Sequence, residues 1–208
     1  MDRENIDRNL PKFLHKVAGE GLRSTRKSPI AYSQQIHSNK IKIISKAGTY
    51  RGYDGLITSE DLILFIKSAD CIPLFFYFPK RGTIGAIHVG WRSLLKGIIS
   101  TSLKACLKKL SLSPSELVFF FGAHIRADNY EVKDDFVRES PAKFKSYITK
   151  KSGKMYFDLT SALGFELESI GVKRDNIYDC GVNTFDEPQL FSYRKGDRQL
   201  FITLIKKK

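Results

Sequence analysis

The chain has 208 residues, 42% hydrophobic and 27% charged, which is typical of one globular domain with a core of its own. A formal net charge of +13 would suit a nucleic acid or another polyanion. The lysines and arginines are scattered along the chain, so we interpret them as a solvated basic surface that also favours a phosphate-bearing substrate. Nucleic acid is therefore not an expected partner.

Cysteine usage and apolar run length indicate a cytoplasmic protein. Three cysteines do not make a disulfide framework, and a reducing cytosol is the simpler setting for them. The polar start, M-D-R-E-N, lacks the apolar stretch of a secretory signal. The longest apolar run, residues 72–78, is much shorter than the ~20 residues that a membrane span needs.

Short apolar runs bounded by turn residues predict a strand-rich chain. Residues 10–17 fit a helix or a strand equally well, and residues 19–29 and 48–55 are predicted loops. Predicted strands occupy residues 30–36, 40–45, 61–67, 72–78, 84–89, 117–121, 176–179, 190–193 and 199–205.

Two stretches carry apolar residues at helical spacing, residues 93–110 and residues 159–170. The apolar positions are Leu95, Ile99, Leu103, Cys106 and Leu110 in the first stretch and Leu163, Leu167 and Ile170 in the second. Because strands and helices mix without a regular βαβ repeat, we predict a single α/β domain over residues 1–208. Its mixed sheet core would be flanked by helices.

Residues 68–92 hold the densest group of reactive side chains. They read S-A-D-C-I-P-L-F-F-Y-F, then a short turn, then I-G-A-I-H-V-G-W-R. Asp70 and Cys71 precede the first predicted strand, and His88, Trp91 and Arg92 lie at the end of the second. Strand ends in α/β folds often carry functional side chains, because the sheet holds them rigidly and loops leave room for a ligand.

His37, Cys71 and His88 each lie at a junction between a predicted strand and a loop. If the sheet brings them together, two imidazoles and one thiolate suit Zn²⁺ with a fourth position open to water or substrate. Such an open site is the catalytic arrangement, because the bound water becomes acidic near neutral pH. The alternative is that the cysteine is a core residue and the histidines are structural, since no standard metal or nucleotide motif occurs.

The segments S-A-D-C-I-P and A-I-H-V-G-W-R, preceded by Q-I-H-S and D-G-L-I-T, resemble the YfiH family. This family is also called DUF152 or the multicopper polyphenol oxidoreductase (laccase) family. G-L-R-S-T-R at residues 21–26, N-Y-E-V at residues 129–132 and F-S-Y-R at residues 191–194 extend the resemblance over most of the chain. The resemblance implies a YfiH-like (CNF1-like) α/β sandwich.

The resemblance also implies a metal site, usually zinc, at the residues that match His37, Cys71 and His88. It further implies a purine nucleoside phosphorylase that cleaves adenosine, inosine and methylthioadenosine with phosphate, and that deaminates adenosine. Purine nucleosides and phosphate are then the expected partners. The older laccase name implies copper, but four histidines are too few ligands for the several coppers that reduce O₂.

Several residues are candidates for the substrate site. Phosphorolysis needs an anion site beside the ribose, and the planar guanidinium groups of Arg26 and Arg92 suit phosphate. The alternative for Arg92 is a structural pair with a carboxylate, and the role of Arg26 is equally open. Asp70 is a candidate proton carrier or partner of a ligand imidazole, with a simple turn role as the alternative. Asp54 has the same alternatives, with the structural one favoured. Trp91 either stacks on a purine or belongs to the core.

His124 and Cys180 are further candidate substrate-binding residues. His124, in G-A-H-I, departs from the pattern of the family, and Cys180, in D-C-G-V-N-T, falls where the family often has a cysteine. Both have structural alternatives, and Cys106 is expected in the core. Two other functions stay open: a metal-free thiol hydrolase built on Cys71 and His88, and a non-enzymatic basic binding module. No aromatic-plus-basic RNA-binding segment supports the second.

Overall fold

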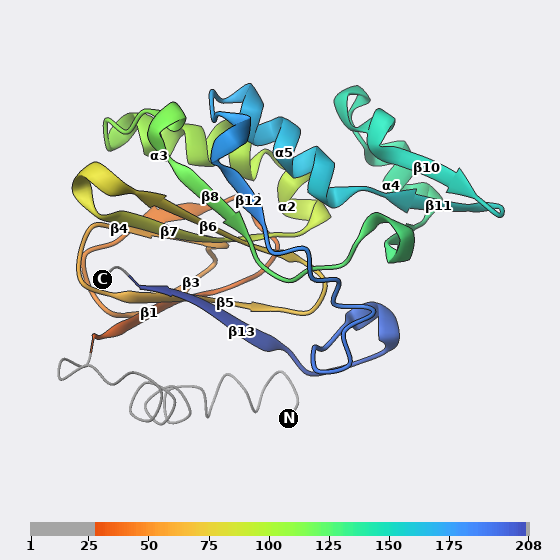
Figure 1. Ribbon diagram of the computed structural model, residues 1–208, viewed down its shortest axis with the longest axis horizontal. Coiled ribbons are helices and arrows are strands. Elements are labelled where there is room, and N and C mark those ends of the chain that lie inside the picture. Colours follow the sequence, from red (N-terminus) through yellow and green to blue (C-terminus); the bar gives the residue numbers. More distant parts are fainter. Residues whose placement is uncertain (1–27, 207–208) are drawn as a thin grey trace.

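The computed structural model describes residues 28–206, and Figure 1 shows two stacked sheets with helices over the larger one. Within this range the larger sheet has the strand order β12-β8-β6-β7-β4-β2, and the smaller sheet the order β13-β5-β1-β3. The larger sheet contains β2 (Ile41–Ile43), β4 (Gly55–Thr58), β6 (Ile72–Phe78), β7 (Thr83–Val89), β8 (Val118–Phe121) and β12 (Ile177–Asp179). The smaller sheet contains β1 (Ile30–Gln34), β3 (Gly48–Arg51), β5 (Ile63–Ser68) and β13 (Phe201–Lys206).

The helical layer and a small third sheet complete the mixed α/β architecture. The helices are α2 (Trp91–Leu95), η2 (Ile98–Leu103), α3 (Lys104–Lys109), α4 (Asp134–Glu139) and α5 (Leu159–Ser169). The third sheet, β10-β11-β9, contains β9 (Glu131–Val132), β10 (Ile148–Lys151) and β11 (Lys154–Phe157). Short 3-10 turns are η1 (Pro79–Arg81), η3 (Pro114–Glu116), η4 (Ala127–Asn129), η5 (Ala142–Tyr147), η6 (Arg174–Asn176) and η7 (Tyr193–Lys195). No described helix is both long and apolar enough to cross a bilayer.

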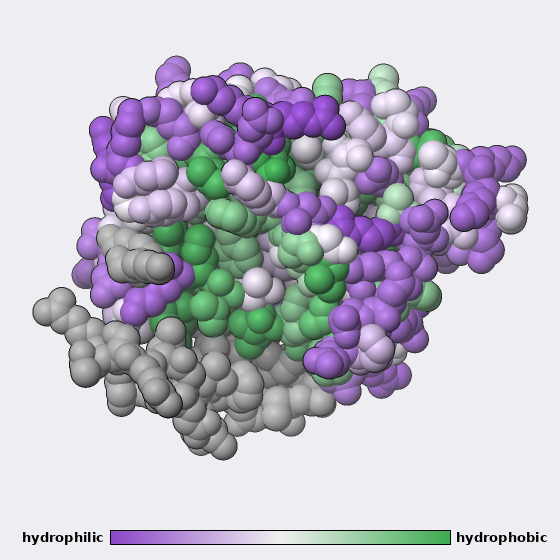
Figure 2. All heavy atoms as spheres, viewed as in Figure 1, coloured by the Kyte–Doolittle hydropathy of each residue, from purple (hydrophilic) through white to green (hydrophobic). Residues whose placement is uncertain are grey.

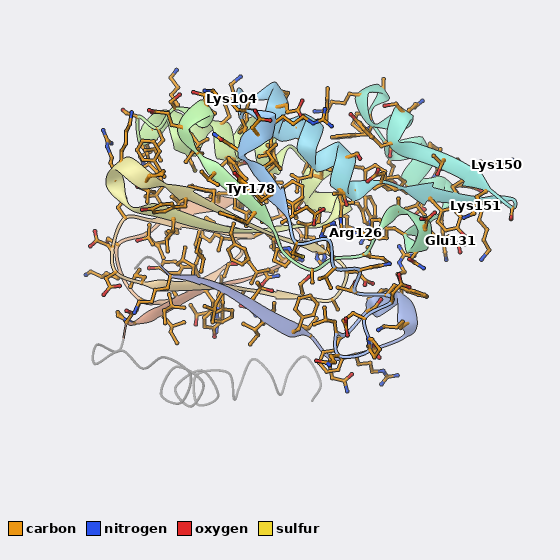
Figure 3. All side chains as sticks on the ribbon, in the orientation of Figure 1. Lys104, Arg126, Glu131, Lys150, Lys151 and Tyr178 are labelled. Carbon is orange, nitrogen blue, oxygen red and sulfur yellow. The ribbon has the colours of Figure 1, made fainter. Side chains whose placement is uncertain are left out.

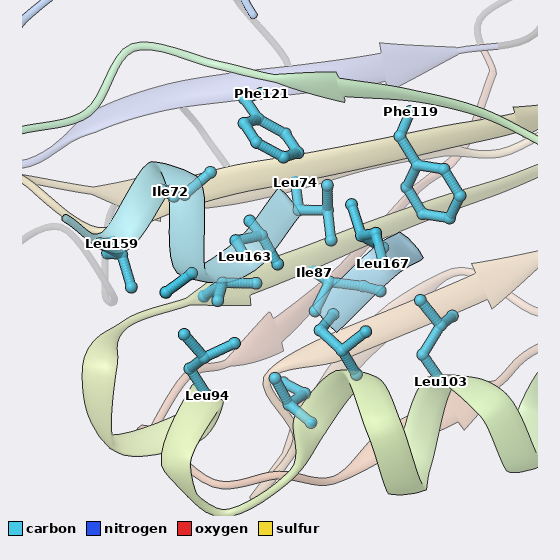
Figure 4. Packing of buried hydrophobic residues seen from close by; sticks show 14 of the residues in the cluster. Ile72, Leu74, Ile87, Leu94, Leu103, Phe119, Phe121, Leu159, Leu163 and Leu167 are labelled. Atoms are coloured by element: carbon cyan, nitrogen blue, oxygen red, sulfur yellow. The ribbon is translucent and has the colours of Figure 1, made fainter. Parts of the chain in front are cut away.

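Side-chain alternation along β6 divides its residues between two cores. Leu74 belongs to the core between the larger sheet and the helices, where it lies near Leu163 of α5 (Figure 4). Phe75 belongs to the core between the two sheets, together with Leu64 and Ala86. Each fully buried side chain of this size contributes about 1.5–3 kcal/mol. Burial on both faces therefore makes the β6–β7 hairpin a rigid support for the side chains at its ends.

The basic residues lie on separate parts of the surface. Figure 2 shows hydrophilic side chains around the rim of one face and hydrophobic side chains in its middle. Lys104 lies on the helical layer, whereas Lys150 and Lys151 lie at the tip of the β10–β11 hairpin (Figure 3). The positive charge is dispersed, which does not favour a continuous polyanion-binding stripe.

Four elements differ from the sequence-based prediction. The loop predicted over residues 48–55 contains β3 and the start of β4, because parallel pairing with β1 and β2 supplies their backbone partners. The single helix predicted over residues 93–110 is interrupted at Gly97, whose φ of 78° is left-handed. Residues 190–193 form no strand and lead into η7. The sequence pattern does not predict the β10–β11 hairpin, because β10 is largely exposed and lysine-rich.

Residues 1–27 lie outside the described range. They include the ambiguous segment 10–17, most of the predicted loop 19–29, and the candidate phosphate ligand Arg26.

Candidate metal centre

The β6–β7 hairpin brings Cys71 and His88 to one end of the larger sheet. In its antiparallel register Ile72 pairs with Val89, and Pro73 pairs with His88. Cys71 comes immediately before Ile72 in the chain, so the hairpin places it next to His88. The two residues that the sequence puts at opposite ends of this segment are thus neighbours in space.

His37 completes the group from the turn that follows β1. Its Nε2 lies 3.8 Å from the Sγ of Cys71, and its ring centroid lies 4.9 Å from that of His88 at an interplanar angle of 73°. One ligand atom from each of the three residues lies within 4.8 Å of the others, so the group could hold a metal ion. Over residues 28–206 it is the one group of three histidine, cysteine or acidic side chains with this spacing.

The buried carboxylate of Asp54 positions both histidines. Asp54 is fully buried, and its two oxygens accept the backbone N–H groups of Ile36, His37 and Ser38 at 3.2, 2.9 and 2.7 Å. These bonds support the left-handed conformation of His37, whose φ is 57°. The Oδ1 atom of Asp54 also lies 3.0 Å from Nδ1 of His88.

The contact with Asp54 determines which nitrogen of His88 is free. A carboxylate can only accept, so the Nδ1 of His88 donates and its Nε2 is left for a metal ion, which is a common arrangement for ligand histidines. Burial raises the pKa of Asp54, but hydrogen bonds from His88 and Ser38 and the charge of His88 bring it below its ordinary value of 3.8. Asp54 is therefore ionised at neutral pH.

Cys71 and His88 form a charged pair in the metal-free protein. Burial raises the pKa of the Cys71 thiol, but the charge of His88 and hydrogen bonds from both histidines outweigh this effect and lower it to about 6. Burial lowers the pKa of His88, but the Cys71 thiolate and the bond to Asp54 raise it to about 9. Thiolate and imidazolium coexist between these two values. The positive charge of a metal ion would replace that of the imidazolium proton.

The absence of a side chain at Gly90 leaves room for Cys71 and His37. A Cβ at this position would lie 2.8 Å from the Sγ of Cys71 and 3.1 Å from Cδ2 of His37. The glycine of H-V-G-W-R is therefore required by packing against the candidate ligands, just before α2 begins. Two imidazoles and one thiolate in this cradle fit the donor preference of zinc.

Two cavities lined by described residues open onto the group. The smaller, of about 310 Å³, is lined by His37, Cys71 and His88 with Lys67 and Gln34 among its walls. The larger, of about 440 Å³, is lined by His37 and Cys71 together with a polar and aromatic wall. This wall contains Asp70, Trp91, Arg92, Tyr130, Tyr193 and Arg194. Either volume suits a small-molecule ligand.

Three of the substrate-site candidates predicted from the sequence, Asp70, Trp91 and Arg92, line the larger cavity. Arg92 is exposed there, and its Cζ lies 4.3 Å from the ring centroid of Trp91. The indole also contacts Phe136 edge-on at 5.1 Å, so it belongs to both the cavity wall and the edge of the core. Asp70 is buried with a φ of 85°. Its oxygens accept hydrogen bonds from the hydroxyl of Thr184 and from the backbone N–H of Arg194, each at 2.8 Å.

His124 and Cys180 line neither cavity. His124 is fully buried, and its nitrogens lie 2.7 Å from the carbonyl oxygen of Gly122 and 2.7 Å from Oγ1 of Thr160. Burial lowers the pKa of His124, so the ring is a neutral structural link between β8 and α5. Cys180 is exposed, and Cys106 is half-buried on α3. The positions of these residues give them no contact with the candidate metal group.

The sequence pattern predicts no role for Tyr130 or Arg194, and it favours a structural role for Asp54. Tyr130 lies in N-Y-E-V and Arg194 in F-S-Y-R, so these two family-like motifs are the sequence signal that points to them. Tyr130 is buried against the larger cavity, and Arg194 places its Cζ 5.0 Å from the Tyr130 ring centroid. Burial and the negative charge of Cys71 raise the pKa of Tyr130, so its phenol is a hydrogen-bond donor.

A family model described as multi-copper polyphenol oxidoreductase laccase matches residues 2–204. The chain belongs to this laccase family. Among its relatives, a purine nucleoside phosphorylase of Campylobacter jejuni is 32% identical over 170 residues, covering 79% of this chain and 70% of that protein. A purine nucleoside phosphorylase of Borreliella burgdorferi is 33% identical over 178 residues, covering 82% of this chain and 76% of that protein.

Two solved structures share the fold of this chain. YlmD from Geobacillus stearothermophilus superposes with a TM-score of 0.82 at 24% identity, covering all of this chain and 82% of that one. YfiH from Bacillus licheniformis gives a TM-score of 0.81 at 20% identity, covering 99% and 82%. The resemblance to the YfiH family, and the α/β fold that it implies, are confirmed.

The pKa of Cys71 can be measured in the metal-free protein by the ultraviolet absorbance of its thiolate. In a background with Cys106→Ser and Cys180→Ser, the absorbance should rise with a midpoint near pH 6, because His88 and His37 stabilise the thiolate. His88→Gln should move the midpoint upward, toward the ordinary value of 9.0. A midpoint near 9 in the protein with His88 intact would refute the proposed pairing.

Gly90→Ala should weaken zinc binding by roughly tenfold or more, because the added methyl group displaces Cys71 and His37. Competition with a coloured chelator measures the affinity. Gly164→Ala is the matched control, since a Cβ at this position of α5 would meet nothing within 4 Å. Equal zinc affinity of the Gly90→Ala variant and the unmodified protein would show that the group does not use this space.

Proposed function

We propose that the chain is a zinc-dependent purine nucleoside phosphorylase with adenosine deaminase activity. The observation that carries the proposal is the His37–Cys71–His88 group, which opens onto two ligand-sized cavities. The purine nucleoside phosphorylase names of relatives at 32–33% identity support the reaction class. Adenosine, inosine and methylthioadenosine are the proposed nucleosides, with phosphate as the second substrate.

The proposed site assigns His37, Cys71 and His88 to the metal. A zinc ion with an open position supplies Lewis acidity, polarising an oxygen of a bound water or substrate. Asp54 holds the backbone of His37 and the Nδ1 of His88, which would leave the Nε2 of His88 to bind the ion.

In phosphorolysis a phosphate oxygen forms a bond to C1′ of the ribose while the bond from C1′ to the base breaks. The electron pair stays on the base, which takes the proton that the phosphate loses. Arg92 is placed to bind an anion in the larger cavity, and Trp91 offers an aromatic surface for the purine. Tyr130 supplies a protonated hydroxyl in the same cavity, suited to donating a hydrogen bond to substrate.

We assign Asp70 the role of holding neighbouring segments of the site in place. Its carboxylate oxygens bind Thr184 and the backbone of Arg194, and it stands next to Cys71 in the chain. It therefore links the ligand turn to the C-terminal part of the cavity wall. In deamination water adds at C6 and the amino group leaves as ammonia. A carboxylate has acceptor sites beyond the two bonds of Asp70, so Asp70 is also our candidate for carrying the proton.

A metal-free thiol hydrolase is the second candidate, because Cys71 and His88 form a thiolate–imidazolium pair. Polyphenol oxidation by several coppers has less support, since residues 28–206 offer one group of three ligands. Zinc and copper both bind imidazole and thiolate, so metal analysis of the purified protein decides between them.

Zinc-loaded protein should release hypoxanthine from inosine in a phosphate-dependent manner. Cys71→Ser should lower the rate at least about a hundredfold, whereas Cys106→Ser should retain it. A chelator should abolish the activity, and added zinc should restore it. The proposal fails if no base is released from any of the three nucleosides. Inactivation by thiol alkylation with indifference to chelators would favour the thiol hydrolase.

A further inference from the structure

Two arginines in the larger cavity stack on aromatic rings, and neither pairs with a carboxylate in the described part of the chain. Arg92 lies over Trp91, at 4.3 Å from its ring centroid, and Arg194 lies over Tyr130, at 5.0 Å. Within residues 28–206 neither guanidinium forms an ion pair or a side-chain hydrogen bond. Stacking on an aromatic face holds a guanidinium in place and leaves its N–H groups directed to the side, free for an acceptor.

The acidic residues of the same cavity are already engaged. Asp70 accepts from Thr184 and from the backbone of Arg194. Glu131 (labelled in Figure 3) pairs with Lys154 at 2.8 Å, and Asp135 accepts the backbone N–H of Phe136 at 2.8 Å. The wall thus holds three basic and three acidic side chains, but the acidic ones have partners other than the guanidinium groups of Arg92 and Arg194. The two arginines are therefore available to an anion.

The position of Arg194 is set by several local interactions. Its backbone N–H donates to Asp70, the residue before the candidate ligand Cys71. The η7 turn that contains it is capped by the buried Ser192 and ends at Gly196, whose φ of 93° is left-handed. Lys195 also donates to the carbonyl oxygens of Glu187 and Leu190, each at 3.1 Å. Arg194 is thus carried on a supported turn that is tied to the metal-ligand segment.

We infer that Arg92 and Arg194 together bind the phosphate co-substrate in the larger cavity, an inference that rests on the proposed phosphorylase activity. Two planar guanidinium groups are suited to the oxygens of a tetrahedral dianion. Cys71 and His37 line the same cavity, so the anion would lie on the side of the metal group that carries Trp91 and Tyr130. The phosphate ester of a nucleoside monophosphate offers the same chemistry, and the experiment separates it from free phosphate.

Calorimetric titration of the zinc-loaded protein with inorganic phosphate tests the inference. Arg194→Gln and Arg92→Gln should each weaken phosphate binding about tenfold to a hundredfold, because each removes charge-assisted hydrogen bonds. Each should also raise the KM for phosphate more than it lowers kcat. Arg138→Gln is the matched control, because Arg138 is exposed on α4 and does not line the cavity. Arg194→Lys should retain part of the binding, since it keeps the charge without the planar group.

The outcomes separate this inference from the proposed activity. Phosphate binding that is unchanged in Arg194→Gln and Arg92→Gln overturns the inference, even if the protein cleaves nucleosides. Weakened phosphate binding in a protein that releases no base supports the anion site and counts against the phosphorylase. Parallel titration with adenosine monophosphate identifies the ligand. If only its binding responds to the two substitutions, the site recognises the ester and the assignment to free phosphate is wrong.

Discussion

The buried carboxylate of Asp54 is the interaction on which the candidate centre depends. A fully buried, ionised carboxylate is stable only when its oxygens accept enough hydrogen bonds. Asp54 receives the N–H groups of the Ile36–Ser38 turn, the hydroxyl of Ser38 and Nδ1 of His88. The same bonds that satisfy its charge hold one histidine in a left-handed turn and orient the other. The same carboxylate therefore supports the 36–38 turn and both candidate histidine ligands.

A second carboxylate connects the candidate ligands to the wall of the larger cavity. Asp70, adjacent to Cys71, binds Thr184 and the backbone of Arg194, which lie more than a hundred residues further along the chain. His37 and Asp70 are both non-glycine residues with positive φ, and such strain persists where the surrounding structure determines it strongly. The two carboxylates thus link the turn after β1, the start of β6 and the η7 turn. The candidate site depends on all three, which explains why it needs the fold as a whole.

The sequence alone predicts the strands that carry the candidate site better than the residues that hydrogen-bond or stack around it. The strands β6 and β7 are clear because they are continuous apolar runs. The positions of His37, Cys71 and His88 at strand ends leave both a metal site and structural roles open, and the family resemblance favours the metal site. For Asp54 the sequence favours a structural role over a functional one, because most of its donors are backbone groups that carry no sequence signature. Arg194 and Tyr130 fall in motifs without evident chemistry, since their roles arise from stacking across the cavity. The reaction class comes from resemblance, and neither spacing nor composition would have identified a purine nucleoside.

Zinc affinity of the Asp54→Asn variant, measured by competition with a chelator, tests the central claim most directly. Asparagine keeps the shape of the side chain but loses the charge and one of the acceptor oxygens that His88 and the 36–38 turn use. If Asp54 organises the centre, the variant should fold, as judged by circular dichroism, and bind zinc about tenfold to a hundredfold more weakly. A folded variant that binds zinc as tightly as the unmodified protein would contradict the account.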